Sequence, residues 1–484
     1  YIKDKDECYT EKMKVLYVSA EVYPLAKVGG LADVASSLPK ALRSLGIDAR
    51  IVMPKYAWIN GCKKIAEFNI EFRGRNELVV VYEKDFESAP LYLISNSHVF
   101  DESTIYNSDN TLCVSKFAFF CKAVLGLVEN NVFTPDIIHC NDWHTGLLPA
   151  YLKHSGKFNN IRTVFTIHNL KFQGDGSTLQ PWELGLDGAD ILHWNRVNPM
   201  KAGIVYADVV NTVSKTYAKE ILTPEYGYTL DGCLRYYKRK LHGIVNGIDY
   251  DDWNPETDKK IYANYNSEAI ENKFINKRKF LEELGLPNYD IPLVGMVSRI
   301  DPSKGYDLII NTLPKFLQQG KINFVFLGVG AKEYQDTLKT LAERYPNNMR
   351  VFFKFDDELS RKIYAGADIF LMPSIFEACG LGQLIAMRYG TIPIVRRTGG
   401  LADTVTDYTT DKENGVGIVF QEPTSEALER AIETAITIYN NKTEWETIIK
   451  RAMNENNSWK RSAKEYVKLY EKARQDITQE TTVE

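Results

Sequence analysis

The sequence Lys27-Val28-Gly29-Gly30-Leu31-Ala32-Asp33 lies between two segments whose patterns predict different secondary structure. The apolar run 15–18 before it is typical of a buried strand, and the segment 31–45 after it has apolar residues at helical spacing. A strand, a glycine turn and a helix in this order bring backbone N–H groups and a helix N-terminus towards an anion. Adjacent glycines allow close approach of a ligand, and Lys27 adds a mobile positive charge. The alternative is an ordinary turn beside a solvated lysine.

The last five residues of this stretch recur as Gly399-Gly400-Leu401-Ala402-Asp403. The second copy also follows an apolar run, residues 392–395, and precedes another amphipathic segment. The repeat indicates two anion-ready units of strand, turn and helix. The two copies need not occupy equivalent places in the fold, because each lies at a different position within its own segment.

The composition is that of an ordinary globular protein with several domains. A chain of 484 residues exceeds one hydrophobic core, so we expect two or three domains. The 59 basic and 63 acidic residues give a net charge of −4, and no basic block could follow a nucleic-acid backbone, so we expect no nucleic-acid partner. The 28 tyrosines suit sugar stacking, although a large core accounts for them better.

Cysteine usage and hydropathy point to a reducing compartment. The seven cysteines are scattered, with no pair at metal-ligand spacing, which argues against disulfides and structural zinc. The sequence offers no apolar run of membrane-spanning length, and its polar start is unlike a signal peptide, so we expect no membrane partner. Residues 1–12 are expected to form a polar extension.

Short apolar runs alternate with helical patterns along most of the chain. Runs that are apolar throughout are typical of parallel strands covered on both faces, so the fold class is α/β. The expected strands are residues 15–20, 49–53, 78–82, 91–94, 137–140, 163–167 and 209–212 in the first half, and 293–297, 322–327, 350–353, 369–372, 392–395 and 417–420 in the second. The expected helices include 111–129, 147–153, 215–222, 268–284, 384–389 and 459–474, the last with Ser458 as its N-cap.

A turn signal at Asn246-Gly247-Ile248-Asp249 marks the expected domain boundary. Residues 13–247 and 248–459 would form two doubly wound domains, and the final helix must dock on structure already built. Two such domains facing each other would hold a ligand in a cleft at the carboxyl ends of their strands, with a hinge near Gly247.

Candidate phosphate-binding groups follow the strands of the second half. Arg299 lies at the tip of the strand 293–297, and Lys304 lies at the start of the next helix, so both can converge on one diphosphate, although surface cations would give the same pattern. Glu377 follows the strand 369–372, and the amides of Leu381 and Gly382 lie at a helix start that can hold a leaving phosphate. For Glu377 the alternative is a solvated loop carboxylate.

Two further motifs bear on function. Gly328-Val329-Gly330 also follows a strand, but Glu333 replaces the third glycine of a dinucleotide fingerprint, so nicotinamide binding is weakly indicated. In the first half, Asn141-Asp142-Trp143-His144 and His168-Asn169-Leu170 follow consecutive strands. An isolated histidine is more often structural, but two at neighbouring strand ends favour a functional site.

Taken together, the motifs resemble those of bacterial glycogen synthases and plant starch synthases, in the family's order, from about residue 13 to about residue 469. The stretches that carry the resemblance are residues 27–33, 141–144, 168–170, 246–249, 304–305, 376–377, 379–381 and 396–405. The resemblance implies a GT-B fold of two Rossmann-like domains, with residues 460–484 crossing back to complete the first. It also implies a cytoplasmic enzyme, or a plastid enzyme in a plant or alga.

The implied reaction transfers glucose from ADP-glucose to the non-reducing end of an α-1,4-glucan with retention, without a metal or other cofactor. The implied catalytic residues are Lys27, Asp142, His168, Arg299, Lys304 and Glu377. Positive groups from both domains would meet around one diphosphate, His168 would lie near the anomeric carbon, and Asp142 with Trp143 and His144 would lie on the acceptor side. The implied donor-binding set adds Gly29, Gly30, Asp33, Asn169, Asn246, Phe355 near the adenine, Cys379, Gly380, Leu381 and Gly382.

The sequence departs from the family pattern in three places. Ala378 and Gly382 replace a common proline and threonine, the loop through Gly174 is short, and Pro199 replaces an aromatic residue. Because the main-chain amide of Gly382 remains, we expect weaker rather than absent donor binding. The competing interpretations are a GT-B transferase that uses UDP-glucose or another acceptor, a nucleotide-binding dehydrogenase, and a catalytically weak glucan-binding relative.

Overall fold

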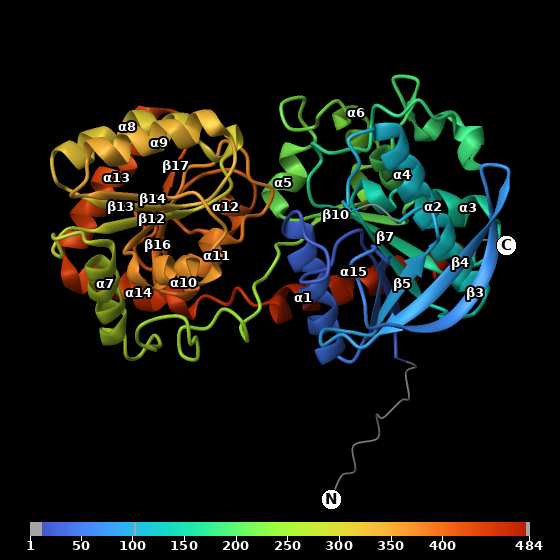
Figure 1. Cartoon of the computed structure of the whole chain (residues 1–484), viewed down its shortest axis with the longest axis horizontal. Coiled ribbons are helices and arrows are strands. Elements are labelled where there is room, and N and C mark those ends of the chain that lie inside the picture. The colour runs from blue at the N-terminus through green and yellow to red at the C-terminus, as the bar shows by residue number, and fades with distance from the viewer. Residues whose placement is uncertain (1–11, 101–102, 481–484) are drawn as a thin grey trace, which may run out of the picture. The chain divides into compact units, whose positions relative to one another are not determined.

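The computed structural model describes residues 12–100 and 103–480 of the chain (Figure 1). The chain divides into two compact units. Unit 1 contains the residues up to Val213, Ala218–Ile244 and the residues from Ser462, and unit 2 contains Ser214–Tyr217 and Val245–Arg461. Each unit is built around a twisted sheet with helices on both faces (Figure 1).

In unit 1 most strands are parallel. The parallel strands are β1 (Lys14–Val18), β2 (Asp48–Pro54), β5 (Leu91–Ser95), β6 (Ile137–Asn141), β7 (Arg162–Ile167), β10 (Val209–Thr212) and β11 (Leu241–Gly243). At one edge β4 (Arg75–Lys84) pairs antiparallel with β5 and with β3 (Lys63–Phe72). The strand order is β11-β10-β7-β6-β1-β2-β5-β4-β3, so the chain reverses its direction of winding between β1 and β6. That reversal is the topological switch point of unit 1, where an open α/β sheet binds its ligand.

The helices of unit 1 flank this sheet and carry its loops. They are α1 (Gly30–Ser44), α2 (Asn110–Glu129), α3 (Leu147–His154), α4 (Pro199–Tyr206), α6 (Asp231–Tyr236), the second half of α5 (Lys215–Glu220) and the larger part of α15 (Trp459–Glu480). Short 3₁₀ turns stand at η1 (Trp143–Thr145), η2 (Pro181–Leu184), η3 (Ala189–Ile191) and η4 (Lys238–Lys240), and β8 (Leu192–His193) pairs with β9 (Arg196–Val197) in a small hairpin.

Helix α2 corrects one expectation from the sequence. By length and composition it could cross a membrane, so the expectation of no apolar run of that length was wrong. Most of α2 is buried inside unit 1, where Phe117, Phe119 and Phe120 enter the core. A helix that is apolar all round is typical of a position between other layers of a domain.

The C-terminal helix is tied to the sheet of unit 1 by buried polar contacts. The Tyr470 hydroxyl lies 2.7 Å from His139 Nδ1, and Asn211 Nδ2 donates to the Tyr466 hydroxyl at 3.2 Å. Because all four side chains are buried, each of these groups requires its partner.

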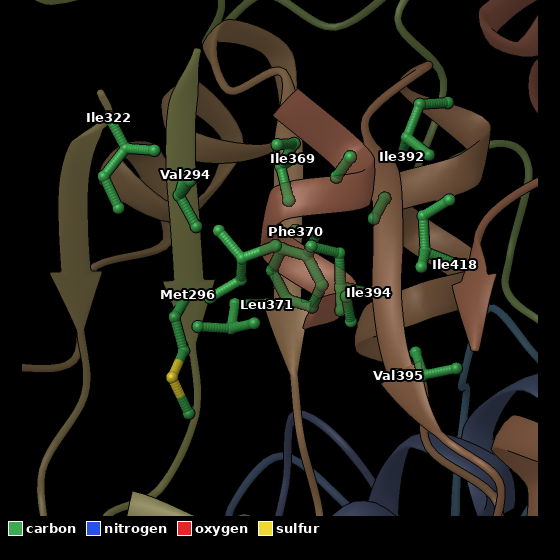
Figure 2. Close-up of a cluster of buried hydrophobic side chains, with 14 of the residues drawn as sticks. Val294, Met296, Ile322, Ile369, Phe370, Leu371, Ile392, Ile394, Val395 and Ile418 are labelled. Carbon is green, nitrogen blue, oxygen red and sulfur yellow. The ribbon is translucent and has the colours of Figure 1, made fainter. Parts of the chain in front are cut away.

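The sheet of unit 2 is wholly parallel within the described residues. Its strands are β12 (Leu293–Val297), β13 (Asn323–Leu327), β14 (Met349–Phe352), β15 (Ile369–Met372), β16 (Ile392–Arg396) and β17 (Ile418–Phe420). They lie in the order β14-β13-β12-β15-β16-β17, which places the switch point between β12 and β15. Figure 2 shows how Val294, Met296, Phe370, Ile394 and their neighbours fill the core around these strands.

In unit 2 one helix precedes β12, and at least one helix follows each strand. The helices are α7 (Glu271–Leu284), α8 (Tyr306–Gln318), α9 (Lys332–Arg344), α10 (Asp357–Gly366), α11 (Gly382–Arg388), α12 (Gly399–Thr404), α13 (Ser425–Asn440) and α14 (Lys442–Asn454), with the 3₁₀ turn η5 (Pro302–Lys304) ahead of α8. The alternation of parallel strands and helices confirms the predicted α/β class.

Candidate active site

In unit 1, the glycine turn between β1 and α1 is exposed at its main chain. A Cβ atom placed on Gly29 or Gly30 would meet no heavy atom within 4 Å, so a ligand can approach the backbone there. The amides of the turn do bind a carboxylate, but this carboxylate is a side chain of the protein itself. Glu21 Oε2 accepts hydrogen bonds from Val28 N at 2.6 Å and from Gly29 N at 3.0 Å.

The other oxygen of Glu21 accepts from the Tyr106 hydroxyl, and the Glu21 side chain is buried. The sequence reasoning missed both residues. An acidic residue three positions after a buried strand was the available signal for Glu21, whereas Tyr106 lies 85 positions away and gave none. These contacts fix the shape of the turn ahead of α1.

The Lys27 ammonium also has a carboxylate partner in unit 1. It lies 2.7 Å from Asp33 Oδ1, with side-chain exposures of 43% and 32%. An ion pair this exposed contributes little to stability, about 0–1 kcal/mol, and exchanges partners readily. A bound diphosphate would therefore compete with Asp33 for Lys27.

At the switch point of unit 1, Asp142 follows β6 in an unusual conformation. Its φ of 56° and ψ of −178° fall in a region that costs a residue with a side chain about 1–3 kcal/mol and is enriched at functional sites. Its buried Oδ1 accepts from His168 N at 2.7 Å and from Asn169 N at 3.3 Å, so it ties the end of β6 to the end of β7. Burial raises the pKa of the Asp142 carboxyl to about 7.

His168 lies next to this carboxylate and is held as a neutral ring. Its Nε2 lies 2.9 Å from Asn141 Oδ1. Burial lowers the pKa of His168 to about 3, so the imidazole carries no charge near neutral pH. The structure thus brings Asp142, His168 and Asn169 together, as the sequence predicted for neighbouring strand ends.

Trp143 and His144 are less accessible than an acceptor-binding role would suggest. Both side chains are buried, and their rings meet the Phe117 ring of α2 at centroid distances of 5.3 and 4.9 Å. Burial lowers the pKa of His144 to about 3. Their side chains pack beneath the Asp142 loop, and the prediction that they contact the acceptor stays untested.

In unit 2, the switch point brings Lys304 and Glu377 together. Lys304 Nζ lies 2.5 Å from Glu377 Oε2, and the Ser374 hydroxyl donates to the same oxygen at 3.0 Å. The two charged side chains are 18% and 11% exposed, so this pair is far better shielded from solvent than Lys27 and Asp33. Ser374, which the sequence reasoning did not single out, keeps Glu377 oriented.

Arg299 differs from both lysines. It is exposed at the end of β12, and in the part of the chain that the structure describes its guanidinium has no ion-pair partner. Its carbonyl is held by the Ser298 hydroxyl at 2.8 Å and the Tyr306 hydroxyl at 3.3 Å, so the backbone beneath the side chain is fixed. A fixed backbone with an uncommitted guanidinium is suited to gripping a phosphate.

The loop that carries Glu377 is shaped by the second copy of the repeated pentapeptide. A Cβ atom on Gly399 would lie 1.8 Å from Glu377 O, and Gly400 N donates to Ala378 O at 3.1 Å. From below, Arg396 Nε donates to Ser374 O at 3.0 Å. This copy supports the Glu377 loop and binds it through the main chain, so its glycines are not open to a ligand.

Comparison with known proteins matches these features to an established family. The family model described as "Starch synthase catalytic domain" matches residues 14–236, and the one described as "Glycosyl transferases group 1" matches residues 278–452. Glycogen synthases of Clostridium beijerinckii and Thermotoga maritima are each 44% identical, over 95% of this chain and 98% and 99% of their own lengths. The chain belongs to the glycogen and starch synthase family.

Solved structures agree with this assignment. The catalytic domain of starch synthase IV from Arabidopsis thaliana, bound to ADP and acarbose, superimposes with a TM-score of 0.86 at 34% identity, covering 96% of this chain and 100% of that one. A sucrose-phosphate synthase from Thermosynechococcus elongatus shares the fold alone, with a TM-score of 0.63 at 17% identity. This synthase is therefore a glycosyltransferase with the predicted GT-B architecture.

Two departures from the family pattern have local explanations in this synthase. At Gly382, the first residue of α11, a Cβ atom would lie 3.0 Å from the Phe370 ring, so the ring and the glycine are fitted to each other. Pro199 occupies the first turn of α4, where a proline is favourable, and Asn198 caps the helix by accepting from Lys201 N at 2.8 Å.

The short loop after His168 is packed onto the acceptor-side motif. Gly174 has a φ of 69°, and a Cβ atom there would lie 2.3 Å from the Trp143 ring. Next to it, Gln173 accepts from Asn198 Nδ2 at 2.7 Å and donates to Tyr228 O at 2.8 Å. The short loop is thus held by Trp143 on one side and by Asn198 and Tyr228 on the other.

Gly328 and Gly330 have a structural role in the synthase. Cβ atoms at these positions would lie 1.8 Å from Ser298 O and 2.1 Å from Ile300 O, because the chain after β13 runs against the chain after β12. The glycines permit this close approach, which accounts for the pattern without a nicotinamide site.

The remaining predicted donor-binding residues vary in accessibility. Phe355 is 85% exposed, whereas Asn246 is buried, and its Oδ1 has no hydrogen-bond partner among the described residues. Cys379 is buried, and burial raises the pKa of its thiol to about 12, so it stays protonated. Gly380 takes a φ of 78° and Leu381 caps α11, as the helix start predicted from the sequence requires. Within the described residues, no cluster of three or more His, Cys, Asp or Glu side chains could hold a metal ion.

Proposed function

We propose that this synthase transfers glucose from ADP-glucose to the non-reducing end of an α-1,4-glucan with retention of configuration. The observation that carries the proposal is the arrangement at the switch point of unit 2, where Lys304, Glu377 and Ser374 meet and Arg299 stands uncommitted. The relative whose structure was solved with ADP and acarbose supports a nucleotide donor and a glucan acceptor.

The donor diphosphate is assigned to Arg299 and Lys304. As the bond from glucose to the diphosphate breaks, negative charge grows on the leaving phosphate, and groups that bind this charge more strongly in the transition state accelerate the reaction. Arg299 supplies a planar fork for two phosphate oxygens, and Lys304 supplies a compact charge. Lys304 enters this role already oriented by Glu377.

Glu377 is assigned to the donor sugar. A carboxylate beside the glucose can accept hydrogen bonds from its hydroxyls and favour the positive charge that develops at the anomeric carbon. The Ser374 hydroxyl and the Lys304 ammonium keep one oxygen of Glu377 occupied, which leaves the other for the sugar.

In unit 1, His168 and Asp142 are assigned to the sugar and the acceptor. The neutral imidazole of His168 can accept or donate a hydrogen bond without adding charge near the anomeric carbon. Asp142 holds the main chain of His168 and Asn169 and so sets their position.

The leaving charge is proposed to be balanced by side chains rather than by a metal ion or another cofactor. Glucosyl transfer that is unchanged after treatment with EDTA would support this proposal, and transfer that is abolished and restored by Mg²⁺ would contradict it. We also propose a cytoplasmic location, since the cysteines of the sequence are scattered rather than arranged as a disulfide framework.

Incorporation of labelled glucose into glycogen from ADP-glucose and UDP-glucose, measured side by side, tests the donor. The proposal expects preference for ADP-glucose, whereas equal or better use of UDP-glucose would favour the other donor. Glu377→Ala should abolish most incorporation. Lys315→Ala, which removes an exposed lysine paired with Glu429 on the surface of unit 2, is the matched control and should leave incorporation unchanged.

A further inference from the structure

The side chain of Asn141 joins the proposed catalytic histidine to the core of unit 1. It is fully buried at the end of β6, and its Oδ1 lies 2.9 Å from His168 Nε2. The Tyr17 hydroxyl, from the neighbouring strand β1, donates to the same oxygen at 2.9 Å. The sequence reasoning treated Asn141 only as part of a motif and gave its side chain no role.

The orientation of the Asn141 amide follows from its other contacts. Its Nδ2 donates to Val18 O at 3.0 Å and to His139 O at 3.3 Å, and a carbonyl oxygen can only accept. The amide nitrogen must therefore face these carbonyls, and Oδ1 must face Tyr17 and His168. A flipped amide would place two oxygens against each other at both contacts.

This orientation decides the protonation of His168. An amide oxygen accepts a hydrogen bond and cannot donate one, so Nε2 of His168 must carry a proton. In a neutral imidazole the second nitrogen, Nδ1, is then left with its lone pair. Burial keeps the ring neutral, because it lowers the pKa of His168 to about 3.

We propose that Asn141 is a positioning residue that holds His168 as the neutral Nε2–H imidazole and thereby leaves Nδ1 as the acceptor for a sugar hydroxyl of the substrate. The inference rests on the proposed function for the identity of that hydroxyl. An imidazolium has a proton on both nitrogens, so it could not accept a hydrogen bond from a sugar hydroxyl, and it would repel the positive charge developing at the anomeric carbon. A fixed neutral tautomer therefore serves both binding and catalysis.

Asp142 completes the hold on His168 from the main chain. Its Oδ1 accepts from His168 N at 2.7 Å, so two successive residues at the end of β6, Asn141 and Asp142, bind the histidine, the first through its ring and the second through its backbone. The titratable groups around the ring are Tyr17 on β1, His139 on β6, Asp142 and His144. His139 and His144 are neutral near pH 7, because burial lowers the pKa of each to about 3.

Imidazole nitrogen NMR of the full-length protein with ¹⁵N-labelled histidine tests this inference, with the His168 signals assigned by their loss in His168→Gln. The wild type should show a neutral ring with its proton on Nε2 from pH 6 to pH 8. In Asn141→Asp, a carboxylate faces Nε2, and we expect the pKa of His168 to rise by about 1–3 units. A wild-type ring protonated on Nδ1, or doubly protonated at pH 7, would overturn the inference.

Asn211→Asp is the matched control. Asn211 is equally buried in the same sheet, but its side chain contacts Thr166 and Tyr466. It tests whether a buried carboxylate in this sheet shifts His168 without direct contact, and we expect the His168 signals to stay unchanged. Equal shifts in both variants would contradict a specific role for Asn141. If Asn141→Asp does not fold, the wild-type tautomer alone still decides.

The same variants separate this inference from the proposed function. In Asn141→Asp, glucosyl transfer should fall relative to the wild type by up to about tenfold as the pH is lowered from 7 to 5, because a His168 pKa raised from about 3 to between about 4 and 6 lets the ring gain a proton over this range. A wild type that transfers no glucose would contradict the function while leaving the NMR result intact. A wild type that transfers glucose with the Nδ1–H tautomer would contradict the inference alone.

Discussion

The two switch points of the molecule are built from opposite kinds of groups. In unit 1, Asp142 after β6 and His168 after β7 are neutral or close to it near pH 7, because burial raises the pKa of Asp142 to about 7 and lowers that of His168 to about 3. In unit 2, the ends of β12 and β15 carry the ion pair of Lys304 and Glu377 and the exposed cation Arg299. One switch point is suited to holding hydroxyls and the other to holding phosphate charge.

The two copies of Gly-Gly-Leu-Ala-Asp make the same contrast at the level of the main chain. At Gly29 and Gly30 the backbone is open, and its turn binds the internal carboxylate of Glu21. At Gly399 and Gly400 the backbone is closed over by the Glu377 loop. The pentapeptide predicts a turn and a helix start in both places, but what packs against the glycines decides whether the turn faces a ligand or supports a neighbour.

The largest expected effect of breaking the charged switch point is in Lys304→Ala. Because Lys304 is assigned to charge that grows in the transition state, kcat with ADP-glucose should fall by about 10²–10³, equivalent to roughly 3–4 kcal/mol. Steady-state incorporation of labelled glucose measures this change. A fall of less than threefold would show that Lys304 serves only to neutralise Glu377.

The two glycine turns should respond differently to alanine. In Gly400→Ala the new Cβ would lie 2.2 Å from Cys379 O, so we expect a loss of about 2–3 kcal/mol in the free energy of unfolding. Gly30→Ala meets no neighbour in the first turn of α1 and should leave this quantity unchanged or raise it by up to ~1 kcal/mol. Calorimetric unfolding of both variants makes the comparison, and equal losses would refute it.

The neutral switch point predicts a pH dependence that Asp142→Asn removes. The pKa of Asp142 is about 7 in the folded protein and near 3.8 in an unfolded chain, so the folded state binds the proton more tightly between these values. The stabilisation from this proton is present below about pH 4 and is lost as the pH rises to 7. The thermal midpoint of the wild type should therefore fall relative to Asp142→Asn over this range, and parallel curves would contradict the assignment.

The smallest expected effect is in the exposed pair of unit 1. Asp33→Asn breaks the contact with Lys27, and the free energy of unfolding should change by at most about 1 kcal/mol because both side chains are substantially exposed. Chemical denaturation at low and high salt tests this expectation. A loss of several kcal/mol would mean that the turn depends on this pair.

The sequence predicted the parallel strands well, because such strands are buried on both faces and read as continuous apolar runs. All thirteen expected strands occur, three of them with the expected bounds and the others with ends shifted by at most three residues. It missed the short strands β8, β9 and β11, and it missed β3, a largely exposed edge strand. It also missed the turn at Arg73 and Gly74, which joins β3 to β4 with φ values of 51° and 72°.

For the candidate site, the sequence predicts which residues lie at the ends of strands, but it does not predict which of them contact each other. Lys304 and Glu377 are 73 positions apart, and their meeting follows from the pairing of β12 with β15, which no local pattern shows. The internal anion Glu21 and the closing of Gly399 against Glu377 also depend on tertiary contacts. Local sequence predicts which residue types lie at the strand ends, whereas the order of the strands in the sheet decides which of these residues meet.

The kinetics of Arg299→Ala test the central claim most directly, since Arg299 is the uncommitted cation at the charged switch point. With ADP-glucose and glycogen, the account predicts that kcat falls by about 10²–10³ while KM for ADP-glucose changes by less than about tenfold, as expected for a group that acts mainly in the transition state. A kcat equal to that of the wild type would contradict the claim that the cations of unit 2 stabilise the departing diphosphate.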